Sequence, residues 1–257
     1  PAQLTANETL TANLAITRYD GSLADSVEMP TLGADNGLTL ASMIGKSYDD
    51  PEWDPLLDQL TFNEMVNTIT LGFHNTAAVE SIGKTATKDE NGPQGLTAKL
   101  TGGISGMCYT SEDVMAATFN TDLVNDVGRC IGEDCLNLGF SGLYGPGINM
   151  HRTAYSGRNF EYFSSDPFVA GTIVAAEVQG IQSKGVYVYL KHVALNDSES
   201  SRRGVNTWLN EQTAREIYLE VADKAVTNGG AWSVMTGFNR WGAYWCGAYD
   251  QLLTGFL

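Results

Sequence analysis

Two clusters of polar side chains in the middle of the chain each follow a short apolar run that ends abruptly. At the carboxyl ends of parallel strands, such side chains converge on one crevice that the loops can shape. Their cations can donate charge-assisted hydrogen bonds, which are about twice as strong as neutral ones. The first cluster contains Arg152, Arg158, Asn159 and Glu161, and the second contains Lys191, His192 and Asn196.

The Lys191–His192 pair also has a structural interpretation. In that interpretation Lys191 pairs with a nearby carboxylate and His192 caps a loop. A carboxylate close to an arginine is also usually a structural partner, so Glu161 is expected to orient its neighbours and is not a candidate acid or base. A functional interpretation of Lys191 and His192 therefore depends on the sequence around them.

The remaining ligand-type residues do not indicate a metal site. The three histidines are His74, His151 and His192, and the four cysteines are Cys108, Cys130, Cys135 and Cys246. They form neither an HExxH nor a CxxC motif, so we predict no metal and no cofactor. The cysteines are expected to be free and buried. Two of them, Cys130 and Cys135, lie about 140° apart on one predicted helix and would not face each other.

Length and charge restrict the possible classes of protein. The 257 residues suffice for one large domain or part of one, and the net charge of -15 disfavours nucleic acid and anionic membranes as partners. No apolar run approaches the roughly 20 residues of a spanning helix. The lack of a signal-peptide pattern favours the cytoplasm. The first residue is Pro rather than Met, however, so a removed leader and secretion stay open.

Apolar periodicity predicts alternating strands and helices that would position the two clusters. Thr61 and Glu64 have capping-box spacing, and Phe62, Met65, Val66 and Ile69 form one apolar face of the helix that follows. Residues 1–50 lack periodicity and are expected to form an extended linker or interdomain arm. A strand and loop are expected at 81–96, strands at 141–150, 186–190 and 231–235, a helix pair at 111–138, and helices at 166–184 and 210–225. The expected capping residues of these helices are Asn120 or Thr121, Asp166 and Asn210. Repeated βα units of this kind imply a mostly parallel sheet.

Five sequence words resemble the barrel domain of glycoside hydrolase family 3, the β-glucosidase and β-xylosidase family. They are NGPQGL (91–96), GPGINMHR (145–152), GRNFEY (157–162), KHVALND (191–197) and VMTGFN (234–239), in family order. The resemblance implies an α/β fold of the (β/α)8 TIM-barrel type, incomplete at its C-terminal side, over residues 51–257. The segment ASMIGKSYDDPEWDPLLDQLT is similar to the junction in members whose second, α/β sandwich domain precedes the barrel.

The resemblance also implies roles for residues within the five words. Lys191, His192 and Arg158 would donate hydrogen bonds to sugar hydroxyls, while the supporting residues would be Arg152, Asn159, Glu161 and Met235. Asn91 would be a sugar ligand, although it stands where family members commonly carry Asp and offers no charge. Glu90 or Asp89 could take over that carboxylate role.

Aromatic residues near the strand ends could form a platform for the apolar face of a pyranose. They are Trp208, Trp241, Tyr244 and Trp245. Trp241 is the expected subsite wall, and ordinary packing is the alternative for each of the four.

The activity that the resemblance implies is that of a retaining, exo-acting β-glycosidase on terminal β-D-glucosyl or related residues. No catalytic carboxylate is expected within this chain, because the family nucleophile would lie beyond Leu257 and the acid/base commonly comes from the second domain. This chain alone would then be inactive and would depend on the remaining segments of its protein. Two alternatives stay open, a non-catalytic sugar-binding protein on a decayed barrel and a purely structural fragment. The N-acetylglucosaminidase branch is disfavoured, because KHVALND lacks the second histidine of its KHFPGHG-like word.

Overall fold

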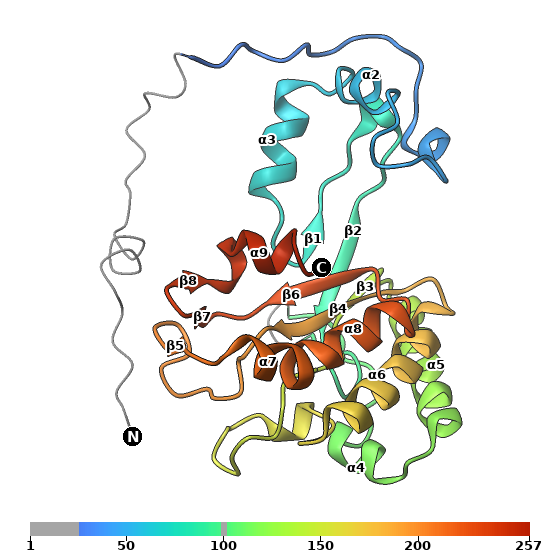
Figure 1. Ribbon diagram of the computed structural model, residues 1–257. Helices are drawn as coiled ribbons and strands as arrows, with labels where there is room; N and C mark the ends of the chain where they lie inside the picture. The colour runs from blue at the N-terminus through green and yellow to red at the C-terminus, as the bar shows by residue number, and fades with distance from the viewer. Residues whose placement is uncertain (1–25, 99–101) are drawn as a thin grey trace. The chain divides into compact units, whose positions relative to one another are not determined.

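A computed structural model describes residues 26–98 and 102–257 (Figure 1). Over these residues the chain divides into two compact units, a smaller one that ends at residue 89 and a larger one that begins at residue 90. The part of the expected N-terminal arm that falls on residues 1–25 lies outside the described residues. The expected boundary near residue 50 stays a prediction.

The smaller unit contains short elements around a small apolar core. They are η2 (Leu40–Met43), α2 (Trp53–Leu57), α3 (Phe62–Thr70), β1 (Asn75–Thr76) and η3 (Glu80–Ile82). Its buried apolar residues are Met43, Leu56, Val79 and Ile82. The capping box predicted before α3 is confirmed, because the Thr61 hydroxyl accepts a hydrogen bond from Glu64 N while the Glu64 carboxylate accepts one from Thr61 N.

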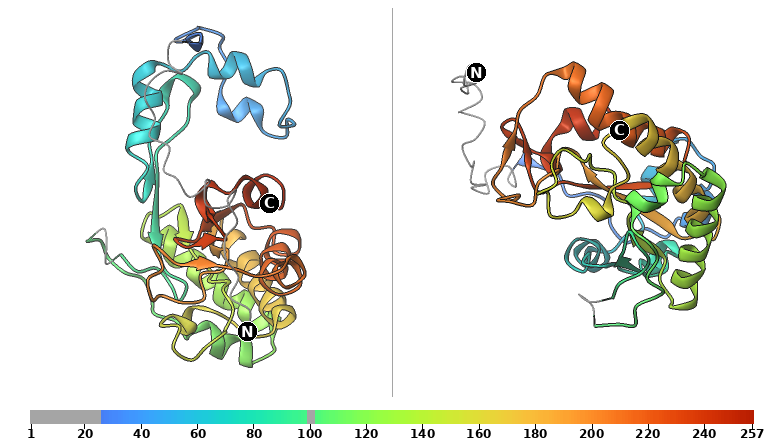
Figure 2. Two further views of the ribbon diagram at one scale, coloured as in Figure 1. Left: turned by 60° about the vertical axis from the view of Figure 1, so that its left-hand side comes forward. Right: turned by 90° about the horizontal axis from the view of Figure 1, so that it is seen from below.

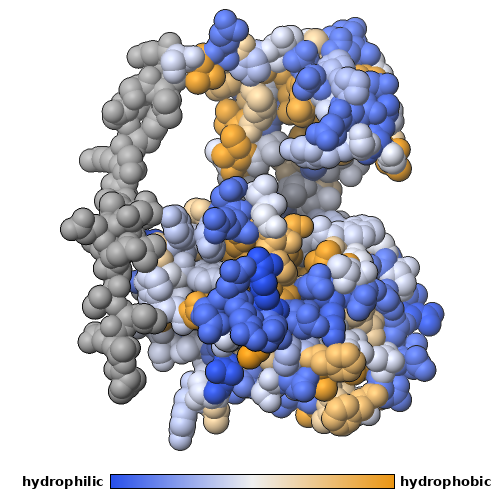
Figure 3. All heavy atoms as spheres, viewed as in Figure 1, coloured by the Kyte–Doolittle hydropathy of each residue, from blue (hydrophilic) through white to orange (hydrophobic). Residues whose placement is uncertain are grey.

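The apolar face predicted for α3 is present but is not buried. None of the helix residues is buried, and Phe62 and Ile69 keep 60% and 82% of their surface exposed. Figure 3 shows apolar side chains gathered on the surface over α3. A helix face is buried only where another element covers it, and the four core residues of the smaller unit all lie outside α3.

The larger unit is built on parallel strands that alternate with helices, as the periodicity predicts. From the end of β2 (Thr87–Asn91) the strand order continues through β3 (Gly142–Tyr144), β4 (Tyr187–Val193) and β6 (Ser233–Thr236). The pairs β3–β4 and β4–β6 are parallel. The helices are α4 (Glu112–Ala117), α5 (Thr121–Asn137), α6 (Pro167–Gln182), α7 (Glu211–Thr213) and α8 (Glu220–Thr227), with a π-helical turn η5 (Ala214–Leu219) joining the last two.

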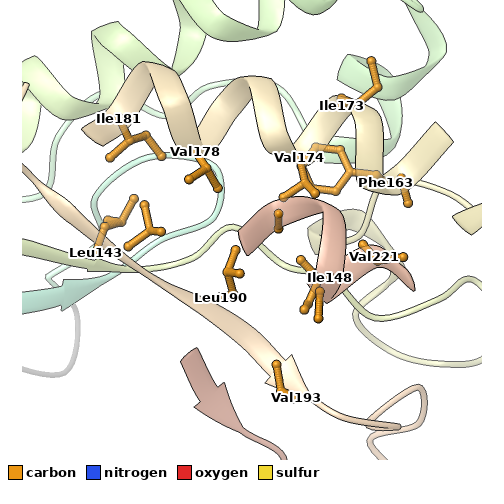
Figure 4. Packing of buried hydrophobic residues seen from close by; sticks show 14 of the residues in the cluster. Leu143, Ile148, Phe163, Ile173, Val174, Val178, Ile181, Leu190, Val193 and Val221 are labelled. Atoms are coloured by element: carbon orange, nitrogen blue, oxygen red, sulfur yellow. The ribbon is translucent and has the colours of Figure 1, made fainter. Parts of the chain in front are cut away.

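Helices α5, α6 and α8 lie side by side along one face of these strands (Figure 2). On α6 the residues Val174, Val178 and Ile181 point toward Leu143 of β3 and Leu190 of β4 (Figure 4). The helices pack closely at glycines, since a Cβ added at Gly180 would collide with the carbonyl oxygen of Asn125 on α5. Close packing of this kind fixes the strand ends that carry the polar clusters.

The helix starts predicted from capping residues are confirmed. The side chains of Asn120, Asp166 and Asn210 accept hydrogen bonds from the backbone N–H three residues later, at 3.0, 3.0 and 2.8 Å respectively. Pro167 follows Asp166 in the first turn of α6, where its missing N–H costs nothing. Short polar side chains before an apolar run therefore mark these helix starts correctly.

The C-terminal segment adds a small three-stranded sheet and two short helical turns. Its strands are β5 (Asn206–Thr207), β7 (Arg240–Trp241) and β8 (Tyr244–Trp245), followed by η6 (Cys246–Ala248) and α9 (Asp250–Leu253). A further turn, η4 (Asn159–Glu161), lies between β3 and α6. Within residues 26–98 and 102–257, no helix is long and apolar enough to cross a membrane.

The four cysteines are free, but the prediction that all are buried is wrong for two of them. Cys135 and Cys246 are buried, whereas Cys108 and Cys130 are exposed. Cys130 lies on the outer side of α5, in agreement with its predicted angle from Cys135. Among the described residues, no group of three His, Cys, Asp or Glu side chains is arranged to hold a metal ion.

Candidate active site

The end of β4 brings the Lys191–His192 pair next to residues from two other elements. The β4–β6 register places Met235 directly opposite Lys191. On the other side, Lys191 O accepts a hydrogen bond from Ile148 N at 2.6 Å, and Lys191 N donates to Pro146 O at 3.1 Å. Both polar clusters therefore lie at one end of the parallel strands, as the sequence predicts.

Glu161 is the centre of a buried ion-pair group. Arg158 donates to it through Nε at 2.9 Å and through Nη2 at 2.6 Å, a bidentate arrangement. Lys191 Nζ lies 3.2 Å from Glu161 Oε2. Lys191 and Glu161 are only 4% and 8% exposed. One carboxylate thus holds two cations in fixed positions at the strand end, and we call Arg158, Glu161, Lys191 and His192 the strand-end group.

The charges of this group follow from burial and mutual attraction. Burial tends to raise the pKa of Glu161, but hydrogen bonds from Arg158 and the charge of Lys191 outweigh it and hold that pKa below its ordinary value. Burial lowers the pKa of Lys191, and Glu161 opposes the change. Glu161 is therefore an ionised orienting group rather than an acid. The supporting role at a sugar site predicted for it stays a prediction.

His192 is neutral, and its ring nitrogens are both engaged. Burial, followed by the charges of Arg158, Lys191 and Arg202, lowers its pKa to about 2. Arg158 Nη1 lies 3.3 Å from Nε2, and Asn149 Oδ1 lies 3.1 Å from Nδ1. Because a guanidinium can only donate, Nε2 accepts and the proton sits on Nδ1. The hydrogen bond that His192 is predicted to donate to a sugar hydroxyl stays a prediction, because both ring nitrogens have partners within the protein.

Asn149 and Glu199 complete the surroundings of the group, and the sequence reasoning missed both. The Asn149 side chain accepts from His192 N and donates to His192 O, both at 3.0 Å. Glu199 lies 3.5 Å from Arg158 Nη1, and it also accepts from Arg202 at 2.6 Å. Asn149 falls within the word GPGINMHR, which was the available signal for it.

Arg152 and Asn159 stabilise the loop after β3 and make no contact with a strand-end side chain in the described geometry. The guanidinium of Arg152 lies 5.9 Å from the centre of the Tyr218 ring. The Asn159 amide donates to Thr153 O at 2.8 Å.

Asp197 lies close to the same loop and accepts a hydrogen bond from Met150 N at 3.0 Å. Burial raises the pKa of Asp197 to about 6, although that hydrogen bond and the charge of Arg152 both lower it.

Asn91 lies at the neighbouring strand end of β2. Its backbone N–H and its side-chain amide both donate to Glu90 Oε1, at 2.8 and 3.1 Å. The next residue, Gly92, donates to Tyr144 O of β3 at 3.3 Å. The structure thus places Asn91 beside the loop of β3, with its amide donors turned toward Glu90.

Trp241 lies apart from the strand-end group. It lines a cavity of about 290 Å³ together with residues such as Leu209, Tyr249 and Leu252, and none of the strand-end group lines it. Its ring meets Tyr249 edge-on at 5.6 Å between centres. The other aromatic candidates, Trp208, Tyr244 and Trp245, are exposed. The structure therefore does not bring the expected subsite wall together with Lys191.

The comparisons with known proteins point to one family. The model of the glycosyl hydrolase family 3 N-terminal domain matches residues 60–257. The chain is 35% identical over 211 residues to thermostable β-glucosidase B of Acetivibrio thermocellus, covering 79% of this chain and 28% of that protein. It is 31% identical to an exo-α-(1→6)-L-arabinopyranosidase of Bifidobacterium longum, covering 72% and 26%.

Solved structures give the same result. A β-glucosidase of Kluyveromyces marxianus in complex with glucose has a TM-score of 0.73 at 31% identity, covering 78% of this chain and 24% of that one. A β-glucosidase of Paenibacillus barengoltzii has a TM-score of 0.74 at 27% identity, covering 93% and 27%. The chain spans about a quarter of the length of the relatives that it matches.

Proposed function

Because the chain belongs to glycosyl hydrolase family 3, and its larger unit is an incomplete (β/α)8-type barrel, we propose that it carries the sugar-binding residues of a retaining, exo-acting β-glycosidase. The substrate would be a terminal β-D-glucosyl or related residue of an oligosaccharide or glycoside. The nucleophile and the acid/base would come from other segments of the same protein, including an α/β sandwich domain. Residues 51–257 would form the barrel part, with residues 1–50 as the linking arm.

The strand-end group is the observation that supports this proposal. Glu161 takes one of the three N–H bonds of Lys191, and within residues 26–98 and 102–257 this ammonium has no other ion pair, so two donors are left for hydroxyl groups. A neutral sugar needs donors and acceptors of this kind rather than a net charge of opposite sign. Lys191, His192 and Glu161 are also almost dry, which strengthens each hydrogen bond that they make. A fixed, buried ammonium at a strand end suits recognition of a sugar hydroxyl.

The stereochemistry of hydrolysis tests the reaction type. We expect the full-length protein to hydrolyse p-nitrophenyl β-D-glucoside and to release the β-anomer of glucose first, because retention follows from two successive inversions. Proton NMR during the first turnovers distinguishes the anomers. The matched α-glucoside serves as the control and should be inert. Release of the α-anomer would rule out the retaining mechanism, and absence of hydrolysis would rule out the glycosidase.

A non-catalytic sugar-binding protein is the second candidate. Asn91 favours it, because the family commonly carries a carboxylate at this position and Asn91 supplies no charge to a sugar. In that case glucose would raise the melting temperature of the full-length protein although no glucoside is hydrolysed.

A further inference from the structure

Two glutamates of the larger unit are fully buried and are not used by the proposed reaction. Glu112 is the first residue of α4 and Glu177 lies on the apolar helix α6, and both are 0% exposed. Neither oxygen of Glu177 has a hydrogen-bond partner, and Glu112 Oε1 has none either. Glu112 Oε2 accepts a hydrogen bond from the side-chain amide of Gln94. Such burial needs a physical explanation.

Protonation provides that explanation, because a bare carboxylate in a dry interior is far costlier than a neutral acid. Burial raises the pKa of Glu177 to about 8. For Glu112, burial and then the charge of Glu177 raise the pKa well above its ordinary value. Two like charges in one dry site repel strongly, so at neutral pH the pair keeps at least one proton.

The pair is connected to the sugar-binding loops through Gln94. The Gln94 amide donates both to Glu112 and, at 2.7 Å, to Phe160 O. Gln94 belongs to the loop that carries Asn91, and Phe160 directly precedes Glu161. One amide group therefore holds two loops that meet at the strand ends, and its anchor is the Glu112 carboxyl group.

Few charged groups face the pair. The charge of Glu161 on η4 helps to raise the pKa of Glu112. The charge of Glu112 in turn opposes the lowering of the pKa of Lys191 on β4. Gln94 is neutral, and α5 approaches the backbone of Glu177 at Gly128, which has no side chain. No cation forms an ion pair with either carboxyl group within the described residues. A second negative charge would thus have no counter-ion and would repel Glu161.

We propose that Glu112 and Glu177, with at least one of the two protonated, act as positioning residues, holding Gln94 and thereby the Phe160–Glu161 turn in the sugar-binding arrangement. The inference rests on the proposed function, since it assigns the pair to the same site. When both carboxyl groups ionise, repulsion disturbs the Gln94 link, and Glu161 no longer holds Lys191 and Arg158 in place. Sugar affinity then depends on a proton outside the reaction itself.

The test compares Glu177→Gln with the parent in the full-length protein, using glucose as the ligand. Calorimetry from about pH 6 to about pH 9.5 should show the parent losing about fivefold or more of its glucose affinity on the alkaline side. Glu177→Gln should lose much less, because an amide cannot ionise. Lys191 is present in both proteins, so any loss of its own charge appears in both profiles.

Two further variants make the result specific. Glu112→Gln also leaves a single ionisable carboxyl group and should flatten the profile in the same way. Glu133→Gln is the matched control, because Glu133 is exposed on α5 and forms an ion pair with Lys184 at 2.9 Å, away from the strand-end group. Its profile should follow the parent. A Glu177→Gln protein with the parental pH profile would overturn the proposal, even if it melts at a lower temperature.

Infrared spectroscopy tests the protonation of the pair independently of sugar binding. The parent at neutral pH should show the C=O stretch of a protonated carboxyl group, and a double variant with Glu112→Gln and Glu177→Gln should show a weaker band. Absence of that band in the parent would overturn the inference and leave the proposed function intact. If the parent binds no glucose at any pH, the proposed function fails and the positioning role fails with it, while the band still reports the proton.

Discussion

Lys191→Met in the full-length protein should lower kcat/KM for an aryl β-glucoside by roughly 30-fold to 1000-fold, equivalent to about 2 to 4 kcal/mol of transition-state stabilisation. Methionine keeps most of the apolar stem but removes three donors and one charge. The ammonium lies 3.2 Å from Glu161 and is fixed there before substrate arrives. Its hydrogen bonds to the sugar should strengthen as the oxocarbenium-like state forms. Glu161 keeps its two bonds from Arg158, so the substitution does not strand a buried charge.

Lys184→Met is the matched control for this substitution. Lys184 follows α6 and pairs on the surface with Glu133, where an ion pair contributes little. Its kcat/KM should stay within about threefold of the parent, which is less than 1 kcal/mol. A Lys191→Met protein that melts several degrees lower while its folded fraction keeps near-parental kinetics would contradict the assignment. Lys191 would then be a structural partner of Glu161 only.

The 257-residue chain by itself should hydrolyse p-nitrophenyl β-glucoside no faster than the uncatalysed reaction. The retaining mechanism needs two carboxyl groups about 5.5 Å apart, one as nucleophile and one as acid/base. Three carboxylates around the strand-end group already have other partners. Glu161 binds Arg158 and Lys191, Glu199 binds Arg158 and Arg202, and Asp197 accepts from Met150 N.

The matching experiment adds the remaining segments of the protein to the chain, and we expect activity to return. Reaction of the isolated chain and of the full-length protein would be followed by p-nitrophenolate release under the same conditions. Turnover by the isolated chain that persists through further purification would show that the chain contains its own catalytic carboxylates. The division of roles between this chain and the rest of the protein would then be wrong.

The sequence predicts the fold of the larger unit well, because local signals and tertiary packing agree there. Asn120, Asp166 and Asn210 begin their helices as capping residues do, and the apolar run before Lys191 forms strand β4, which pairs with β3 and β6. Packing of α3 could not be predicted in the same way. Its apolar face is a local property, whereas burial depends on which other residues cover that face.

The site was predictable where the chemistry lies within the five words. Lys191, Arg158 and Glu161 come together as expected, but the positions of Asn91 and Trp241 relative to them depend on loop conformation. Glu199 reaches Arg158 across 41 positions of the chain, and no local pattern encodes that contact. The arrangement of these residues around the candidate site therefore depends on tertiary structure, which local sequence patterns do not encode.

Glu112 and Glu177 could have been found from periodicity. Glu177 shares the buried face of α6 with Ile173, Val174 and Ile181, and Glu112 shares that of α4 with Met115. A glutamate at a helix position where the apolar spacing predicts burial indicates a buried carboxyl group. Near a helix start, however, Glu112 resembles an ordinary N-terminal acid that favours the helix dipole.

The position of glucose bound to the full-length protein, determined by crystallography, tests the central claim most directly. The strand-end group should hold the sugar, with Lys191 Nζ and a nitrogen of Arg158 about 2.7 to 3.2 Å from its hydroxyl oxygens. Glu161 should keep its contacts with both cations. Glucose bound elsewhere, for instance in the cavity beside Trp241, with Lys191 still contacting only Glu161, would contradict the assignment of this strand end as the sugar site.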